Sequence, residues 1–435
     1  MENINRYPFD LAELVEKGLK SIGIEVPTTE TLAKIFECIY FASLKTEELQ
    51  QICCSLTYID SNNPDPKPPK RIVADRWSYV RFENQIELNI KNVVKLSKAA
   101  NPYTTSIAIY NNETNLYIWG LIDQAHRYHN FINFESSEGS ERPGLFQISI
   151  TGIGSISVFK NYKLIAELRQ GAIINKYHNV LWSGPVSKIL QRYTNEYIKS
   201  VKKSIGKEVS YRRNHWDATL SADWINAIRR ILLGIQRYKH GGALLIIPNN
   251  SFDDLNIKYK ISYDRLSKLL HEVQIKTIHR CTYEDDIFNE YISKNKMDMS
   301  VKLYLDESVS RNGEKEADNG IAGCVRFISS LSCVDGLVLL DKKLEVKGFG
   351  VEIRSDIELK NVYIAGDSLA TPELLKPVEG EHFGTRHRSM MRYCSKFDGS
   401  IGFVISQDGD IRVITKVDDK LIIWENVMIQ LQFES

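Results

Sequence analysis

The sequence predicts two folds in succession: an α+β domain in the N-terminal half and an α/β domain, a mixed sheet flanked by helices, in the C-terminal half. Short β-type runs dominate residues 72–185, which favours antiparallel strands. Beyond about residue 217, helical patterns alternate with short apolar runs, which is typical of an α/β fold. The chain has 435 residues, enough for two or three domains of ordinary size.

The composition excludes several classes of protein. With 43% hydrophobic and 26% charged residues, the chain can bury sizeable cores, so it is neither disordered nor fibrous. A formal net charge of +1 gives no overall field that would attract nucleic acid or an anionic membrane. The longest apolar runs, such as 242–248, are far shorter than the roughly 20 residues that span a bilayer. The N-terminus carries acids and no apolar core. We therefore expect a cytoplasmic protein.

The seven cysteines show no C-x-x-C pairing, which fits reduced thiols. Cys53 and Cys54 are adjacent, but no second Cys/His cluster at ligand spacing accompanies them, so metal binding there is disfavoured.

In the N-terminal half, residues 1–60 are expected to form a helical segment, because apolar residues recur there at helical spacing. Four prolines in the polar stretch 61–71 end this pattern. Residues 72–205 are expected to form an α+β domain. Two hairpins are predicted in it, 106–110 with 116–120 and 145–150 with 156–159.

A basic, helix-forming segment, 191–207, is expected to join the two halves. Its charges fit a solvated connector helix, and they also fit a surface that contacts a phosphate backbone. Because the net charge of the chain is close to zero, nucleic acid is not an expected partner.

Residues 217–435 are expected to form the α/β domain. Ser221 is predicted to cap a first helix, and 243–248, apolar on both faces, to form a central strand. Residues 274–316 have weak periodicity and are expected to form an insertion. The remaining predicted elements are a helix around Leu266–Val273, a helix over 321–331, strands at 334–341 and 344–353, a helix over 384–397, and a final hairpin of 401–406 with 410–416.

Two stretches have the composition of a nucleotide site. Asp335 and Gly336 fall in an apolar run, where a carboxylate needs a cation, a metal or hydrogen-bond donors, or else caps a turn. The second stretch, 384–388, combines helix-terminal amides, a hydroxyl, two guanidiniums and an imidazole, which together suit a polyphosphate. A solvated basic turn is the alternative, although cations at a helix N-terminus oppose its dipole.

Two weaker features accompany these stretches. In 347–353, the glycines leave room for a ligand, and Phe349 or Val351 is suited to lie against a planar base. An ordinary bend in a strand explains the same pattern. Ser406, Gln407 and Asp408 follow a predicted strand, where they would reach a phosphate or a metal, or simply form a hairpin turn.

The combination of Asp-Gly in an apolar run, Gly-Thr-Arg-His-Arg about fifty residues later, and a strand that ends in Ile-Ser-Gln resembles the diadenylate cyclase domain, over roughly residues 217–433. This domain occurs in the DNA-integrity scanning proteins and in membrane-bound cyclic di-AMP synthases. Many members have Ala where this chain has Leu337, and Glu where it has Gln407, so this chain departs from the family pattern at both positions.

The resemblance implies a role for each matched residue. It implies that Asp335, Arg386, His387 and Arg388 are catalytic, and that Asp335 and Gln407 hold Mg²⁺ or Mn²⁺. It implies that nucleotide-binding positions are Gly336, Leu337, Gly350, Val351, Gly384, Thr385 and Ser406. The implied substrate is ATP, and two cyclase domains must face each other in a homo-oligomer.

Residues 72–123 resemble, by texture and order, the variable sensor domain that precedes some bacterial cyclases of this kind. The expected function is thus synthesis of cyclic di-AMP from two ATP under control of an N-terminal sensor. The alternative is a catalytically degenerate receptor for a nucleotide or cyclic dinucleotide, because of Leu337 and Gln407.

Overall fold

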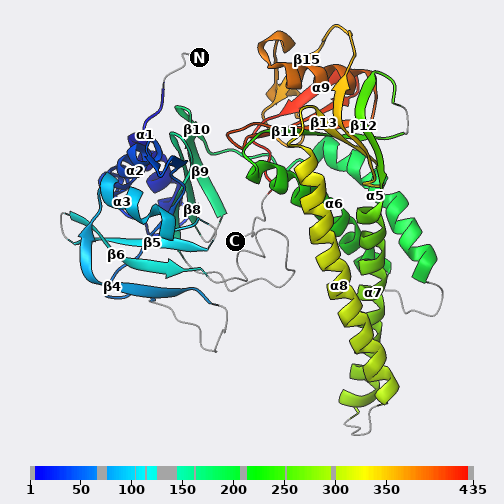
Figure 1. Ribbon diagram of the computed structural model, residues 1–435, viewed down its shortest axis with the longest axis horizontal. Helices are drawn as coiled ribbons and strands as arrows, with labels where there is room; N and C mark the ends of the chain where they lie inside the picture. Colours follow the sequence, from blue (N-terminus) through cyan, green and yellow to red (C-terminus); the bar gives the residue numbers. More distant parts are fainter. Residues whose placement is uncertain are drawn as a thin grey trace. The chain divides into compact units, whose positions relative to one another are not determined.

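The computed structural model describes residues 5–65, 76–102, 104–112, 115–124, 145–160, 163–205, 213–249, 252–294 and 300–429 (Figure 1). Contacts divide the chain into two units, Met1–Lys176 with Leu431–Ser435, and Tyr177–Gln430. The first unit is α+β and the second is α/β with a mixed sheet, so the predicted fold class is confirmed. No helix in the described ranges is long and apolar enough to cross a membrane.

The N-terminal unit is built on an eight-stranded sheet with the order β10-β9-β8-β7-β3-β5-β6-β4. Apolar residues of helices α1 and α2 pack with one face of this sheet in a single core. The helices are α1 (Pro8–Lys20), α2 (Thr29–Ser43) and α3 (Ile90–Leu96). The strands are β3 (Ser55–Tyr58), β4 (Ser78–Glu87), β5 (Thr105–Asn112), β6 (Asn115–Asp123), β7 (Phe146–Gly152), β8 (Ser155–Lys160), β9 (Lys163–Arg169) and β10 (Ala172–Ile174).

Both predicted hairpins of this unit are confirmed, as β5–β6 and β7–β8. The prediction of helix up to residue 60 is wrong beyond Ser43. Short strands β1 (Thr46–Glu47) and β2 (Gln50–Gln51) follow α2, and β3 lies in the middle of the sheet. The four residues of β3 pair with β5 and β7, which are distant in sequence, so the local pattern did not indicate a strand.

The C-terminal unit is built on a nine-stranded mixed sheet with the order β12-β14-β13-β11-β17-β18-β19-β15-β16. Its strands are β11 (Gly242–Ile247), β12 (Leu255–Tyr263), β13 (Leu337–Asp341), β14 (Val346–Ile353), β15 (Val362–Ala365), β16 (Leu375–Pro377), β17 (Ile401–Ile405), β18 (Ile411–Val417) and β19 (Lys420–Trp424). Met390, Met391 and Cys394 of α9 (Thr385–Lys396) pack on one face of the sheet. Helices α6 (Arg213–Arg237) and α8 (Val301–Leu331) lie along the other face (Figure 1).

The predicted buried strand at 243–248, the helix at 384–397 and the final hairpin are confirmed as β11, α9 and β17–β18. Ser221 does not cap a helix, because α6 begins at Arg213 and runs through it. Strands β12, β15, β16 and β19 were not predicted. Strand β12 is half-exposed at the edge of the sheet and carries several polar residues, so it lacks the apolar run of a central strand.

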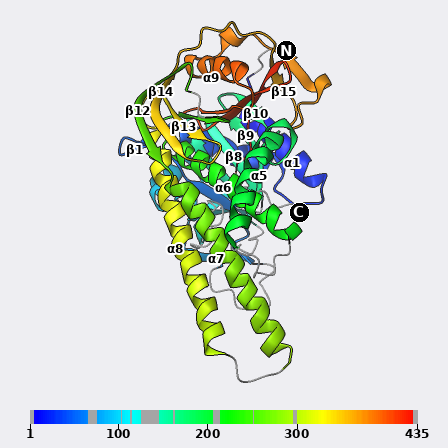
Figure 2. The same ribbon diagram turned by 90° about the vertical axis from the view of Figure 1, so that its right-hand side faces the viewer.

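Of residues 274–316, expected as an insertion, those that the structure describes belong to a long two-helix arm formed by α7 (Arg265–Ile287) and the first half of α8 (Figure 2). The side of α8 that faces α7 carries buried Glu307 and Ser310 as well as Ala317, which explains the weak hydrophobic periodicity. Helix α5 (Gly184–Ile205), which we expected to end the N-terminal domain, groups by contacts with the C-terminal unit.

Asp223 of α6 lies at the base of this arm. Gln274 of α7 donates a hydrogen bond from Nε2 to its Oδ2 at 2.8 Å. Burial is the main reason that the pKa of Asp223 is raised to about 6. The folded protein therefore holds a proton more tightly than the unfolded chain does, and the charged form destabilises the fold above pH 6.

We predict that Asp223→Asn raises the free energy of unfolding at pH 8 by about 1–3 kcal/mol, because the amide still accepts the bond from Gln274 without a buried charge. The gain should vanish near pH 4, where the wild-type carboxyl is protonated. Urea unfolding at both pH values measures this difference, and an equal effect at both would contradict the account.

Candidate active site

Three segments meet at one end of the C-terminal sheet. Strand β11 pairs in parallel with β13, with Leu244 opposite Val338, and antiparallel with β17, with Gly242 opposite Ile405. This register brings the N-termini of β11 and β13 and the C-terminus of β17 to the same end of the sheet. Adjacent strands lie about 4.8 Å apart, so Asp335-Gly336 and Ser406-Gln407 are separated by roughly two strand spacings, about 10 Å.

Helix α9 places Arg386 at the same end of the sheet. A methyl group placed on Gly241 would lie 3.2 Å from Arg386 Nη1, 3.1 Å from the carbonyl oxygen of Ile405 and 3.4 Å from the amide nitrogen of Gln407. The guanidinium therefore lies over the turn that enters β11 and beside the end of β17. The structure thus brings together Arg386, Gln407 and the start of β13 around Gly241, which precedes Gln407 by 166 residues in the sequence.

The predicted helix start at 384–388 is confirmed: Gly384 is the N-cap of α9 and Thr385 is its first residue. Within the described part of the chain, neither Arg386 nor Arg388 forms an ion pair with a carboxylate. Two unpaired guanidiniums and the free amides of a helix N-terminus create a positive potential. This end of the sheet is suited to bind an anion.

Asp335 is not inside a buried strand, as the sequence had suggested. Strand β13 begins two residues later, at Leu337, and Asp335 is exposed. The carboxylate therefore needs no compensation for burial, and it is accessible to a ligand. Lys258 of β12 forms an ion pair with Glu352, Nζ to Oε1 2.9 Å, which is the main reason that the pKa of Lys258 is raised. The negative charge of Asp335 raises the same pKa to a smaller extent.

Gly336 and Gly350 have backbone roles. Gly336 has φ +115°, and a Cβ there would lie 2.5 Å from the carbonyl carbon of Gly350 and 2.8 Å from the nitrogen of Val351. Gly350 has φ +61°, and a Cβ there would lie 3.1 Å from the ring of Tyr259. Both glycines let β13 and β14 approach closely and fix the backbone beside Asp335.

Leu337 and Val351 pair across β13 and β14, and both side chains are buried in the core beneath α9. Their side chains pack within the protein, so the larger Leu337 occupies core volume rather than the exposed edge. Phe349 of β14 is partly exposed, and its ring stacks on the half-exposed Tyr259 with centroids 4.8 Å apart. The sequence did not indicate Tyr259, because β12 carries several polar residues and was not predicted as a strand.

His387 is held by a network that the sequence analysis missed. Arg412 of β18 donates from Nη1 to His387 Nε2 at 3.3 Å. Its guanidinium also pairs with Asp410, Nε to Oδ2 3.1 Å, and with Glu425, Nη2 to Oε1 3.0 Å. The available sign of this network was Arg412 itself, a charged and part-buried residue between the buried Ile411 and Val413 of β18.

The same network keeps His387 neutral. Burial, with the nearby charges of Arg412 and Arg386, lowers its pKa to about 4. Because a guanidinium only donates, Nε2 must be the acceptor and the proton resides on Nδ1. At neutral pH the imidazole is therefore a hydrogen-bond donor and not a third cation.

Ser406 closes the β17–β18 turn. Its Oγ accepts from the amide of Asp410 at 2.9 Å and donates to the Asp410 carbonyl at 3.3 Å. The hairpin-turn interpretation of this segment fits these bonds, while Gln407 and Asp408 are exposed beside it.

No cluster of three His, Cys, Asp or Glu side chains that would hold a metal occurs in the described ranges. The donors at this edge, the Asp335 carboxylate and the Gln407 amide, do not make an all-protein cage. They fit Mg²⁺ or Mn²⁺ that is shared with substrate phosphates, since Mg²⁺ commonly takes one or two carboxylates together with phosphate oxygens.

We predict different effects for two glycine substitutions. Gly336→Ala should lower the free energy of unfolding by about 1–3 kcal/mol, because it places a Cβ against the backbone of β14 at positive φ. Gly384→Ala should cost less than about 1 kcal/mol, since its Cβ would meet no atom within 4 Å. Chemical denaturation of both variants checks this, and equal stability would contradict the described backbone contact.

We also predict a pH effect for His387. The folded-state pKa of about 4 lies below the ordinary 6.5, so stability is lost as the pH falls from 6.5 towards 4 and only the unfolded imidazole takes a proton. In His387→Gln, which keeps an acceptor for Arg412, the fall between pH 7 and 4.5 should be smaller by about 1–2 kcal/mol, allowing for solvent that reaches the ring. Parallel denaturation curves for the two proteins would show that His387 does not titrate in this way.

Comparison with known proteins adds a finding about the other unit. A family model described as a probable sensor domain, DACNV, matches residues 23–123, which include α2 and strands β3–β6. No curated protein matches the chain. Residues 23–123 are therefore similar to a sensor domain.

Proposed function

We propose that the C-terminal unit is a diadenylate cyclase, which condenses two ATP into cyclic di-AMP and two pyrophosphates. The observation that carries this proposal is the convergence of Asp335, Arg386 and Gln407 at one end of the sheet. An exposed carboxylate and an unpaired cationic helix start at the same end of the sheet suit the ribose and the triphosphate of one nucleotide.

The reaction requires two protomers. Each binds one ATP, and the 3′-hydroxyl oxygen of one nucleotide attacks the α-phosphorus of the other. A new 3′-oxygen–phosphorus bond forms, the bond between the α-phosphorus and the bridging oxygen breaks, and pyrophosphate and the hydroxyl proton leave. A second, equivalent step closes the ring, so the enzyme must act as a face-to-face homo-oligomer.

The roles of the side chains follow from their chemistry. Asp335 would accept a hydrogen bond from the 3′-hydroxyl and so increase its nucleophilicity. Arg386, Arg388 and the first amides of α9, including Thr385, would hold the phosphates and stabilise the charge that develops on the leaving pyrophosphate. His387 would donate from Nδ1 to a phosphate oxygen, because Arg412 occupies Nε2. Gly384, which has open space around it, would let a phosphate approach the helix start.

Asp335 and Gln407 are the residues that would hold a divalent cation. When bound, Mg²⁺ or Mn²⁺ would neutralise phosphate charge and polarise the reacting oxygens. Ser406 would act on phosphate only through a rearranged turn, because its hydroxyl already bonds to Asp410.

The N-terminal match supports the regulatory part of the proposal. The matched family is a probable sensor domain of the kind found with diadenylate cyclases. We propose that this domain controls whether two cyclase units meet. A receptor that binds the nucleotide without turnover is the competing function, because a glutamine at 407 supplies no second carboxylate.

We predict that purified protein supplied with ATP and Mg²⁺ or Mn²⁺ yields cyclic di-AMP, identified by mass, together with pyrophosphate. Asp335→Asn and Arg386→Ala should each lower the rate by about two to three orders of magnitude, because each removes one charge that contacts the reacting groups. Both side chains are exposed, so the fold should persist.

Two variants serve as matched controls. Asp398→Asn changes a carboxylate that is 80% exposed at the opposite end of β17, and Arg192→Ala removes an exposed guanidinium on α5. Both should retain the wild-type rate. Nucleotide binding without release of pyrophosphate would instead identify a receptor, and undiminished product from Asp335→Asn would refute the assignment of that residue.

A further inference from the structure

The distal half of α8 carries apolar side chains on the face that points away from its partner helix. Val301 is 73% exposed, Leu305 54% and Val309 63%. A spacing of four residues places them on one stripe of the helix. Phe288 and Ile292, in the π-helical turn that follows α7, and Tyr304 of α8 are also more than half exposed near the tip of the arm. We call Val301, Leu305 and Val309 the tip stripe.

The arm does not need the tip stripe for its own fold. Each residue advances a helix by about 100°, so Glu307, Ser310 and Glu314 lie on the opposite side of α8 from Leu305. These residues face α7, and Glu307 is only 6% exposed. In most helix pairs apolar residues lie between the helices, but here polar residues lie between α7 and α8 and apolar residues face solvent. We call the polar residues between the two helices the polar seam.

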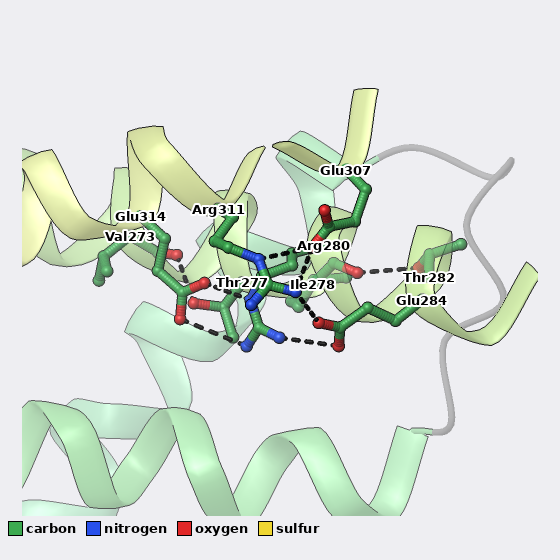
Figure 3. A network of polar contacts seen from close by, with 9 residues as sticks. All are labelled: Val273, Thr277, Ile278, Arg280, Thr282, Glu284, Glu307, Arg311 and Glu314. Atoms are coloured by element: carbon green, nitrogen blue, oxygen red, sulfur yellow. Dashed lines mark hydrogen bonds and ion pairs between the residues drawn. The ribbon is translucent and has the colours of Figure 1, made fainter. Parts of the chain in front are cut away.

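Ion pairs hold the polar seam together (Figure 3). Arg280 of α7 pairs with Glu314 of α8 and, through Nη1, with Glu284 at 2.8 Å. Arg311 of α8 reaches back to Glu284, Nη2 to Oε1 2.9 Å, and also pairs with Glu307. Because each of these charges has a partner, the two helices form a stiff support that presents the tip stripe outward.

We propose that the tip stripe is a self-association surface, which pairs with the same stripe of a second copy of this chain. Its order, Val-Leu-Val at equal spacing, reads the same in both directions. Two antiparallel copies of α8 related by a two-fold axis at Leu305 would therefore match Val301 of each with Val309 of the other and Leu305 with itself. Such self-complementarity is what an isologous contact requires.

The charge of the arm disfavours the other common target of an apolar tip. Residues 284–309 contain seven acidic and three basic residues. An anionic lipid surface attracts basic segments and repels acidic ones. A second copy carries the same acidic excess, but unlike a lipid surface it offers an apolar stripe of the same length and spacing.

This contact differs from the face-to-face contact of the proposed reaction. From Leu305 to Leu331, α8 extends about 39 Å at 1.5 Å per residue, and it ends four residues before Asp335. In a pair joined at Leu305, the two candidate sites would lie about 80 Å apart. The arm contact goes beyond the proposed function, and it would link cyclase units without bringing their sites together.

The test is the mass of the full-length protein in solution, without nucleotide, at about 1–100 μM, measured by light scattering or sedimentation. We expect the mass to rise with concentration, and we expect Leu305→Glu to halve the mass reached at high concentration, because it places like charges opposite each other at the axis. Leu305 is largely exposed, so circular dichroism and thermal unfolding should match the wild type.

Asn319→Glu is the matched control. It adds the same charge to an exposed position on the same side of α8, about 21 Å nearer the base of the arm. It should leave the mass unchanged. An equimolar mixture of Leu305→Glu and Leu305→Lys should restore the larger species, since the two-fold axis would pair the opposite charges.

The proposal is overturned if the wild type stays monomeric throughout this range, or if Leu305→Glu has the wild-type mass. Sedimentation of a monomeric wild type with vesicles of phosphatidylglycerol, lost in Leu305→Glu, would identify a lipid target instead. None of these outcomes depends on turnover of ATP, so failure of the proposed function would leave this test intact.

Discussion

The pairing of β11 with both β13 and β17 is the constraint on which the candidate site depends. One parallel and one antiparallel neighbour bring two strand beginnings and one strand end to the same edge. The turn at Gly241 then leaves room for the guanidinium of Arg386 from α9. Without that register, the carboxylate of Asp335 and the cationic helix start would not lie at the same end of the sheet.

Close strand packing and a part-buried ion-pair network hold the candidate site residues in place. Gly336 and Gly350 let β13 and β14 approach, while Leu337 and Val351 fill the core under α9. Arg412, balanced by Asp410 and Glu425, fixes the ring of His387 and its tautomer. The exposed groups are thereby oriented by buried ones, which limits how much they must reorganise when a ligand binds.

Local patterns predicted the parts of this unit that depend on local sequence. The apolar run of β11, the helix that begins at Gly384 and the Asp-Gly turn of the last hairpin were all recognisable. The start of β13 was not, because Asp335 is excluded from the strand by the backbone contact between Gly336 and Gly350, which are fourteen residues apart. Arg412 and Tyr259 were missed for the same reason: their partners lie on other strands. The roles of the site residues remain predictions.

The most direct measurement is a crystal structure of the protein with a non-hydrolysable ATP analogue and Mn²⁺. The account predicts phosphate oxygens within about 3 Å of the first amides of α9 and of the Arg386 guanidinium, with the ribose towards Asp335. A nucleotide bound elsewhere, or one that reaches only one of these two groups, would contradict it.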